Sequence, residues 1–267
     1  MFGDSLSLLL GPFLGALVTS FAGFAFSPVA GILMIGAVAP QQLVPLLMLC
    51  SVLIQIAIAV HSRRSISPRT IGPMLLGGVA GVPVALFVLR QLDTVVFQVG
   101  FGTFLAVYAA LMLMRPSRGS GRRRGPLTEA AIGWLGGFVG GLTAMPGAVP
   151  VLYADLCGVG KDAQRAMVQP FILSMQLFAL TVMAATSNID GATIALAAEA
   201  LPALAAGTIV GLMLFRRVPD AGFRRVVLVV LMVSGAGTAL ARGDKLMHGA
   251  VSPANASVHS ELRLAVP

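Results

Sequence analysis

Long apolar stretches dominate this sequence, and few charged residues interrupt them. Of the 267 residues, 57% are hydrophobic and only 10% are charged, whereas soluble domains carry about 25% charged residues. Such a chain has too little polar surface to face water, so we expect lipid to be its solvent. In lipid the backbone must be satisfied by helices or closed barrels, and the hydrophobicity is continuous rather than alternating, which favours helices. The sequence therefore predicts an all-α, polytopic transmembrane helical bundle.

Ten apolar segments divide the chain, and two of them are short. The segments run about 5–21, 27–39, 42–60, 71–90, 95–114, 128–142, 146–158, 164–186, 191–214 and 222–241. The second and the seventh are shorter than the roughly 20 residues that a straight spanning helix needs. Each follows a stretch rich in Gly, Ser or Pro, which are residues that break helices. We therefore expect about eight to ten membrane segments, with a broken or re-entrant helix pair in each half.

A shared residue pattern indicates that the two halves are repeats. Three matches have the same offset of 122 residues: Pro28 with Pro150, Gly36 with Gly158 and Gln42 with Gln164. Matches in the same order over two halves with the same segment pattern favour an internal duplication. We place the first transmembrane repeat at 1–114, a basic cytoplasmic linker at 115–127 and the second repeat at 128–241. Residues 242–267 form a polar tail that we expect to be disordered.

The arginine-rich loops predict how the halves are oriented. Basic residues crowd the loops near 63–69, 115–124 and 216–225, whereas the loop near 188–190 has none. Lys and Arg accumulate in cytoplasmic loops, so the loops after the third and the eighth segments lie on opposite sides. The halves are then inverted repeats. The same rule accounts for the net charge of +8, so we expect no nucleic-acid partner.

Polar side chains inside the apolar segments are rare and therefore informative. Ser51 and Gln55 lie in the third segment, and Ser174 and Gln176 lie in the eighth. An amide both donates and accepts hydrogen bonds, so the two glutamines can bind an oxyanion without a buried charge. The alternative is that they only join helices by hydrogen bonds. The sequence leaves both interpretations open.

The two breaks also suit an anion. A helix that begins at Pro28 or Pro150 directs unbonded N–H groups and a partial positive charge into the break. Gly23 and Gly147 allow the backbone to approach a ligand closely, although such glycines also serve tight helix packing. The complete set of candidate substrate-binding residues is Gly23, Phe24, Ser27, Pro28, Ser51, Gln55, Thr143, Met145, Gly147, Ser174 and Gln176.

Paired broken helices in inverted repeats predict a secondary transporter. Glu199 is the candidate proton-coupling carboxylate, with a structural role as the alternative. No catalytic, nucleotide-binding or metal-binding motif occurs in a suitable context, so we expect no enzyme activity, cofactor or metal. The expected partners are a small anionic substrate and the lipid bilayer, and a homo-oligomer is left open. The competing readings are a membrane accessory or structural subunit, a membrane enzyme and a channel.

These residues also resemble the sulfite exporter TauE/SafE family, from about Leu8 to Ala241. The resemblance rests on the stretches 21–29, 136–141, 151–153, 215–219 and 223–225, together with Met145 and Gly147. It implies a multi-pass protein of the cell (inner) membrane that exports sulfite or a related sulfur-containing or organic anion. Family members commonly have Gly-Met-Ser-Gly-Pro-Pro at 144–149 and Asn at the position of Gln55. Because this chain departs from both patterns, the resemblance does not carry over a particular substrate.

Overall fold

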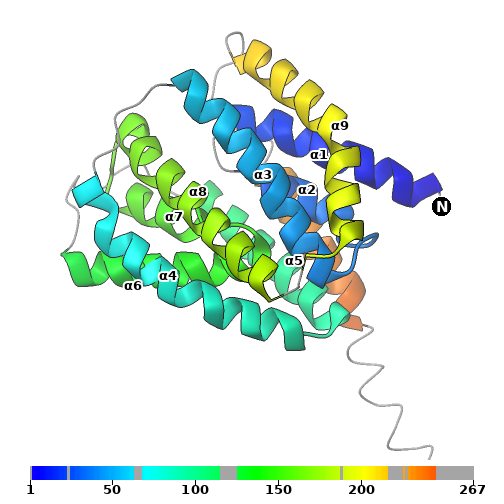
Figure 1. Ribbon diagram of the computed structural model, residues 1–267, viewed down its shortest axis with the longest axis horizontal. Coiled ribbons are helices and arrows are strands. Elements are labelled where there is room, and N and C mark those ends of the chain that lie inside the picture. The colour runs from blue at the N-terminus through cyan, green and yellow to red at the C-terminus, as the bar shows by residue number, and fades with distance from the viewer. Residues whose placement is uncertain are drawn as a thin grey trace, which may run out of the picture.

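The computed structural model describes residues 2–22, 25–62, 68–114, 125–186, 189–215, 225 and 228–244, and these residues contain helices and no strand (Figure 1). The labelled helices are α1 (Phe2–Ala22), α2 (Phe26–Met34), α3 (Pro40–Ser62), α4 (Pro68–Gln91), α5 (Thr94–Leu113), α6 (Pro126–Thr143), α7 (Ala148–Leu156), α8 (Lys161–Ala185) and α9 (Gly191–Phe215). Residues 228–244 form a further helix. The predicted all-α fold is confirmed.

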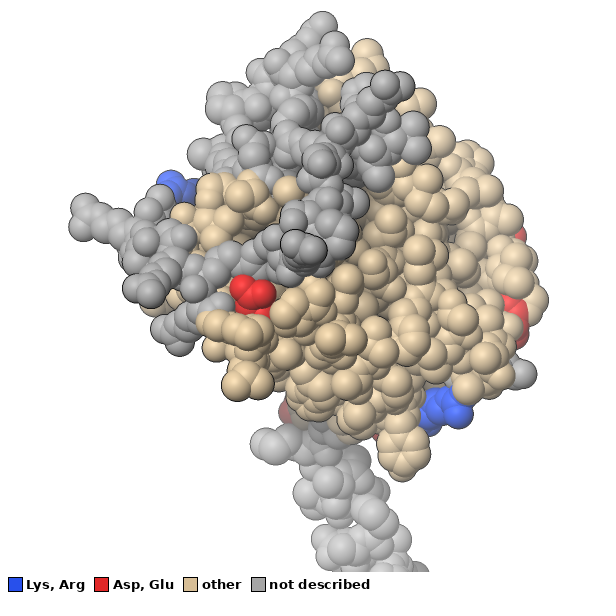
Figure 2. Space-filling view, turned by 60° about the vertical axis from the view of Figure 1, so that its left-hand side comes forward, with Lys and Arg blue, Asp and Glu red and all other residues tan. Residues whose placement is uncertain are grey.

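Several helices are suited to lipid on their outer faces. In the described part of the chain, α3, α4, α5, α8 and α9 are long and apolar enough to cross a membrane. Their outward side chains include Leu76 and Phe87, which are 75% and 66% exposed. Figure 2 shows a face on which charged side chains of the described residues appear only at scattered points. Exposed apolar patches of this extent are rare on soluble monomers, so the structure is that of a polytopic membrane protein.

Two helices are too short to cross a bilayer. α2 and α7 each have nine residues, which corresponds to about 13 Å against the roughly 30 Å of a hydrocarbon core. α2 folds back along α1, where a Cβ on Gly15 would come within 3.0 Å of Phe26 and Ala30. α7 folds back along α6 in the same way, where a Cβ on Gly136 would lie 3.1 Å from Pro150 Cδ. The predicted broken helix pair is therefore present in each half.

Helices of each half pack against helices of the other half, and these contacts come in equivalent pairs. α6, the first helix of the second half, packs most extensively on α4, and α1, the first helix of the first half, packs on α9. In the same way α3 contacts α9, and α8 contacts α4. Figure 1 shows α1 beside α9 and α4 beside α6. These two pairs of contacts correspond to each other when the halves are interchanged, as expected for two repeats around a twofold axis.

Two contacts at one end of the bundle show that the repeats are inverted. Gln42, at the start of α3, donates from Nε2 to Asp190 Oδ2 at 3.0 Å, in the loop after α8. Arg90, near the end of α4, donates to the carbonyl oxygen of Thr186 at 3.2 Å in the same loop. Ser62, the last residue of α3, lies at the far end of that 23-residue helix, about 35 Å away. The chain therefore leaves α3 and α8 at opposite ends of the bundle.

The Asp190 carboxylate is held in its charged form at this end. Its Oδ1 accepts from the backbone N–H and the hydroxyl of Thr193 at 2.8 and 2.6 Å. These bonds, followed by the one from Gln42, lower the pKa of the Asp190 carboxyl, because hydrogen bonds to a carboxylate stabilise its charged form. The start of α9 is thereby tied to the start of α3.

Glycines bring α4 of the first half and α6 of the second half into backbone contact. On α4, a Cβ added to Gly77 would overlap the carbonyl oxygen of Ala130 on α6. On α6, a Cβ added to Gly133 would overlap the carbonyl oxygen of Met74 on α4. Small residues permit this close approach, which supplies the van der Waals packing that holds membrane helices together. Glycine packing therefore joins the first half to the second.

The side of the membrane on which each loop lies is predicted by its charge. We expect reporter fusions after Arg118 and Arg217 to be cytoplasmic, and a fusion after Asn188 to be outside, because Arg-rich loops are retained in the cytoplasm. These three positions lie outside the described residues. The measurement is the activity of side-specific reporters in whole cells. Positions 188 and 217 on the same side of the membrane would contradict both the charge rule and the inverted arrangement.

Candidate functional site

The breaks of the two halves are in direct contact. Ser27, in the first turn of α2, donates from Oγ to the carbonyl oxygen of Ala144 at 2.6 Å. Ala144 follows the last residue of α6, so this bond joins two chain segments 117 residues apart. Both residues are buried, Ser27 at 2% exposure and Ala144 at 1%. The two interruptions predicted separately from the sequence therefore form one buried junction.

The local sequence explains why the helices are interrupted here. Ala144 ends α6 in the left-handed conformation, with φ 58°, which costs a residue with a Cβ about 1 kcal/mol. Gly147 then precedes α7. Pro28 and Pro150 each occupy the third position of their helix, where a missing N–H removes no intrahelical bond. The predicted helix starts at these prolines are therefore each two residues too late.

Gln176 of α8 reaches the same junction. Its Nε2 donates to the hydroxyl oxygen of Ser51 on α3 at 3.0 Å and to the carbonyl oxygen of Ala144 at 3.3 Å. Gln176 is 1% exposed and Ser51 is 4% exposed. The contact links α3 of the first half to α8 of the second. Ser51 and Gln176, both candidates from the sequence, are thus brought together across the two halves.

The Gln176 carbonyl is left without a partner. Both protons of its amide nitrogen are directed at acceptors, Ser51 and Ala144. Its Oε1 is buried and accepts no hydrogen bond in the described part of the chain. Leaving a buried acceptor unsatisfied costs about 1–3 kcal/mol. Gln176 therefore offers an acceptor at this site, in addition to the donors to an oxyanion that the sequence predicted for the two glutamines.

Gln55 lies close to this junction and is available for hydrogen bonding. It follows Ser51 by one helical turn on α3, so the two side chains share a face. The residue is 4% exposed, and its amide has no hydrogen bond to any residue that the structure describes. A buried amide normally has a partner. Its two N–H donors and its carbonyl oxygen are therefore without a partner among the described residues.

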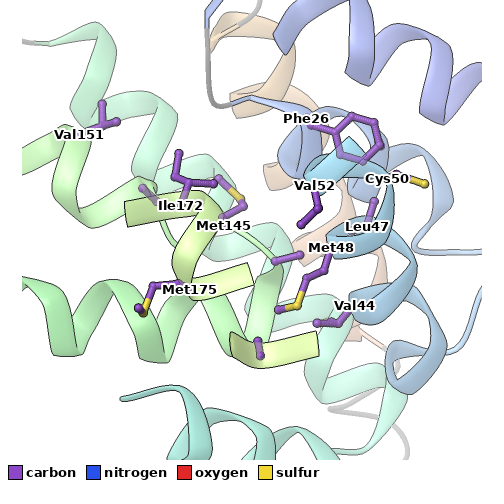
Figure 3. Close-up of a cluster of buried hydrophobic side chains, with 14 of the residues drawn as sticks. Phe26, Val44, Leu47, Met48, Cys50, Val52, Met145, Val151, Ile172 and Met175 are labelled. Atoms are coloured by element: carbon purple, nitrogen blue, oxygen red, sulfur yellow. The ribbon is translucent and has the colours of Figure 1, made fainter. Parts of the chain in front are cut away.

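An apolar wall surrounds these polar groups. Met145, which follows Ala144, is 3% exposed, and Figure 3 shows it with Ile172 of α8 on one side and Leu47, Met48 and Val52 of α3 on the other. Gly147 lets α8 approach the break, because a Cβ there would lie 2.5 Å from Ile172 Cδ1. The wall keeps water from the junction and leaves few polar groups to contact a ligand.

The remaining candidates are placed less centrally. Thr143 is buried, but its hydroxyl donates to the carbonyl oxygen of Val139 on its own helix at 2.7 Å. Ser174 is half-buried and precedes Gln176 by two residues, which turns it to another face of α8. Glu199 is exposed on α9 and is not among the buried groups of the junction. Gly23 and Phe24 lie outside the described residues.

One group at the junction, the backbone carbonyl of Ala144, could not be found from the sequence. The carbonyl oxygen of Ala144 accepts from both Ser27 and Gln176, and a backbone atom cannot be identified from residue types. Among the described residues, no group of three or more His, Cys, Asp or Glu side chains is placed to hold a metal ion.

Comparison with known proteins gives one match. A family model described as "Sulfite exporter TauE/SafE" matches residues 8–238. The matched range begins in α1 and ends in the helix at 228–244, so it contains both halves and the junction between them. No curated protein and no solved structure matches the chain significantly.

Proposed function

Because the chain belongs to the sulfite exporter TauE/SafE family, we propose that it is a secondary transporter that exports a small anion, such as sulfite, an organosulfonate or another organic acid, across the plasma membrane. The observation that carries the proposal is the contact between the two breaks, Ser27 against Ala144 at 2.6 Å. In secondary transporters with inverted repeats, the substrate site lies where the broken helices of the repeats meet.

Alternating access fits the few polar bonds at this junction. The bonds from Ser27 and Gln176 join α2 and α3 of the first half to the second half. A ligand that replaces these partners would allow the halves to separate on one side and then the other. Because the chain leaves α3 and α8 at opposite ends of the bundle, the same movement of each half opens opposite sides of the membrane.

Neutral donors suit an anion that must also be released. Neither the stretch 42–60 of α3 nor the stretch 166–185 of α8 contains Lys or Arg. The nearest donors that no bond in the described chain occupies are instead the amide of Gln55 and the hydroxyl of Ser51, because the Ser27 hydroxyl already donates to Ala144. Preorganised neutral donors replace part of an anion's hydration without the strong attraction of a buried cation. Weak binding of this kind permits turnover.

The proposal is tested by transport in proteoliposomes. Purified protein should give saturable flux of at least one member of a panel of sulfite, organosulfonates and small carboxylates. Empty liposomes provide the background, and a soluble anion of unrelated shape, such as chloride, provides the specificity control. Flux that does not saturate with concentration would favour a channel, and no flux of any panel member would contradict the proposed function.

Proton coupling through Glu199 is a further part of this proposal. Within the five long apolar spans, Glu199 is the one acidic residue, and α9 packs on α3 and on α1, the helix that ends at the first break. We expect Glu199→Gln to abolish transport driven by a pH gradient and to leave substrate exchange intact, because the neutral amide cannot exchange a proton. The measurement compares gradient-driven uptake with counterflow. If transport by the variant depends on pH as it does in the wild type, Glu199 has a structural role and does not carry the coupling proton.

A further inference from the structure

We infer that the junction selects anions that also carry a hydrogen-bond donor: a singly protonated sulfur oxyanion, or a sulfonate-like anion with an adjacent N–H or O–H group. The inference rests on the proposed function, because it names the ligand class of the same site. It starts from the buried and unpartnered Oε1 of Gln176, which requires a donor that the described chain does not supply.

The orientation of the Gln176 amide is fixed by its neighbours. The carbonyl oxygen of Ala144 lies 3.3 Å from Nε2, and a carbonyl has no proton to give. Turning the amide over would set Oε1 against that oxygen, acceptor against acceptor, and would lose the bond. Ser51 does not decide between the orientations, since a hydroxyl both donates and accepts. Ala144 therefore determines which end of the amide remains unpartnered.

The bonds already made at the junction limit what a ligand can contact. The Ala144 carbonyl has two lone pairs and accepts two bonds, one from Ser27 and one from Gln176. The two amide protons of Gln176 are both directed at acceptors. Three groups remain without a partner among the described residues: the buried Oε1 of Gln176, the hydroxyl proton of Ser51, and the amide of Gln55 one helical turn from Ser51. A complementary ligand therefore presents oxygens to Gln55 and a donor to Gln176.

A fully deprotonated dianion fits this pair poorly. Its oxygens would meet the partial negative charge of Oε1, and burial would cost it the full hydration of two charges. A monoanion with a proton to donate satisfies Oε1 and carries less charge into the apolar wall. The difference amounts to one made or unmade hydrogen bond at a buried acceptor, about tenfold in affinity.

Two probe anions isolate the donor. Methanesulfonate and sulfamate are tetrahedral monoanions of similar size that differ in carrying a methyl or an amino group. Binding to the purified full-length protein is measured by calorimetry. Sulfamate should bind about tenfold more tightly than methanesulfonate, as one hydrogen bond to a buried acceptor predicts.

Two variants test whether Gln176 Oε1 is the atom that causes the preference for sulfamate over methanesulfonate. Gln176→Met keeps the length of the side chain and removes the acceptor, so the two anions should bind with equal affinity. Gln55→Met removes donors to the anionic oxygens, so both affinities should fall while their ratio remains about ten. A ratio retained in Gln176→Met would overturn the assignment.

The wild-type protein tests the inference without any variant. Equal affinity for the two probes would overturn donor selection while the transport proposal stands. No binding of either probe, together with no flux of any anion in proteoliposomes, would overturn the inference and the proposed function together.

Discussion

Gly133→Ala is expected to destabilise the protein by about 3 kcal/mol or more, which is a large part of the 5–15 kcal/mol that stabilises a typical protein. The added Cβ would overlap the backbone carbonyl of Met74 on α4. Backbone atoms of a packed helix cannot move aside as a flexible side chain can, so α4 and α6 would have to separate. These helices make the most extensive contact between the halves.

Gly72→Ala is the matched control for this change. Gly72 lies in α4, the helix against which Gly133 packs, and a Cβ there would meet nothing within 4 Å. Ala has the higher helix propensity, so this variant should be neutral or more stable by up to about 1 kcal/mol. The measurement is the unfolding midpoint of both variants in detergent. Equal midpoints would show that the close approach of α4 and α6 does not contribute to stability.

Gln55→Leu and Gln176→Leu should each weaken substrate binding by about ten- to a hundredfold, since a hydrogen bond to a charged group contributes roughly 1.5–3 kcal/mol. The Gln55 variant would lose the two amide N–H groups that can donate to the anion. Gln176 would lose the acceptor and also the link between Ser51 and Ala144. Both variants replace an amide with an apolar group of similar volume, so the protein should still fold and insert.

Gln98→Leu provides the matched control for the two glutamine variants. Gln98 of α5 is equally buried, at 5% exposure, but its Nε2 donates to the carbonyl oxygen of Ile35 at 2.7 Å. Its role is to fix the end of α2, so Gln98→Leu should lower stability and leave substrate affinity unchanged. Wild-type affinity in both Gln55→Leu and Gln176→Leu would mean that these amides only join helices and that the substrate binds elsewhere.

The helices, the breaks and the inversion could be predicted because they depend on local composition. Low charge required lipid, and the short segments near 27–39 and 146–158 became α2 and α7. Opposite arginine content in equivalent loops predicted the inversion that the bond between Gln42 and Asp190 shows. Each of these features depends on the composition of a continuous stretch of sequence, so it can be predicted without knowing how the helices pack.

The detailed contacts could not be predicted, because they depend on helix rotation and on backbone atoms. The sequence placed Ser51, Gln55, Ser174 and Gln176 at similar depth, but only the rotation of α8 decides that Gln176 rather than Ser174 faces Ser51. The sequence pattern did not single out Gln98, although its amide is buried in the structure. The acceptor at the centre is the Ala144 carbonyl, and its exposure to Ser27 follows from the left-handed end of α6.

The central claim is that substrate binds between the two breaks, and the reactivity of a cysteine at position 27 tests it most directly. Ser27→Cys is nearly isosteric and is made after the buried Cys50 and Cys157 have been replaced by Ala. Thr186→Cys, at an exposed loop position, serves as the control. The measurement is the rate of modification by a small thiol reagent, with and without a transported anion, in protein that retains flux.

Substrate at saturating concentration should slow the modification of Cys at position 27 by about tenfold, because roughly 90% occupancy leaves a tenth of the sites open, and it should leave position 186 unchanged. A rate at position 27 that saturating substrate does not alter, in protein that still transports the anion, would contradict the claim that the junction of the breaks is the substrate site.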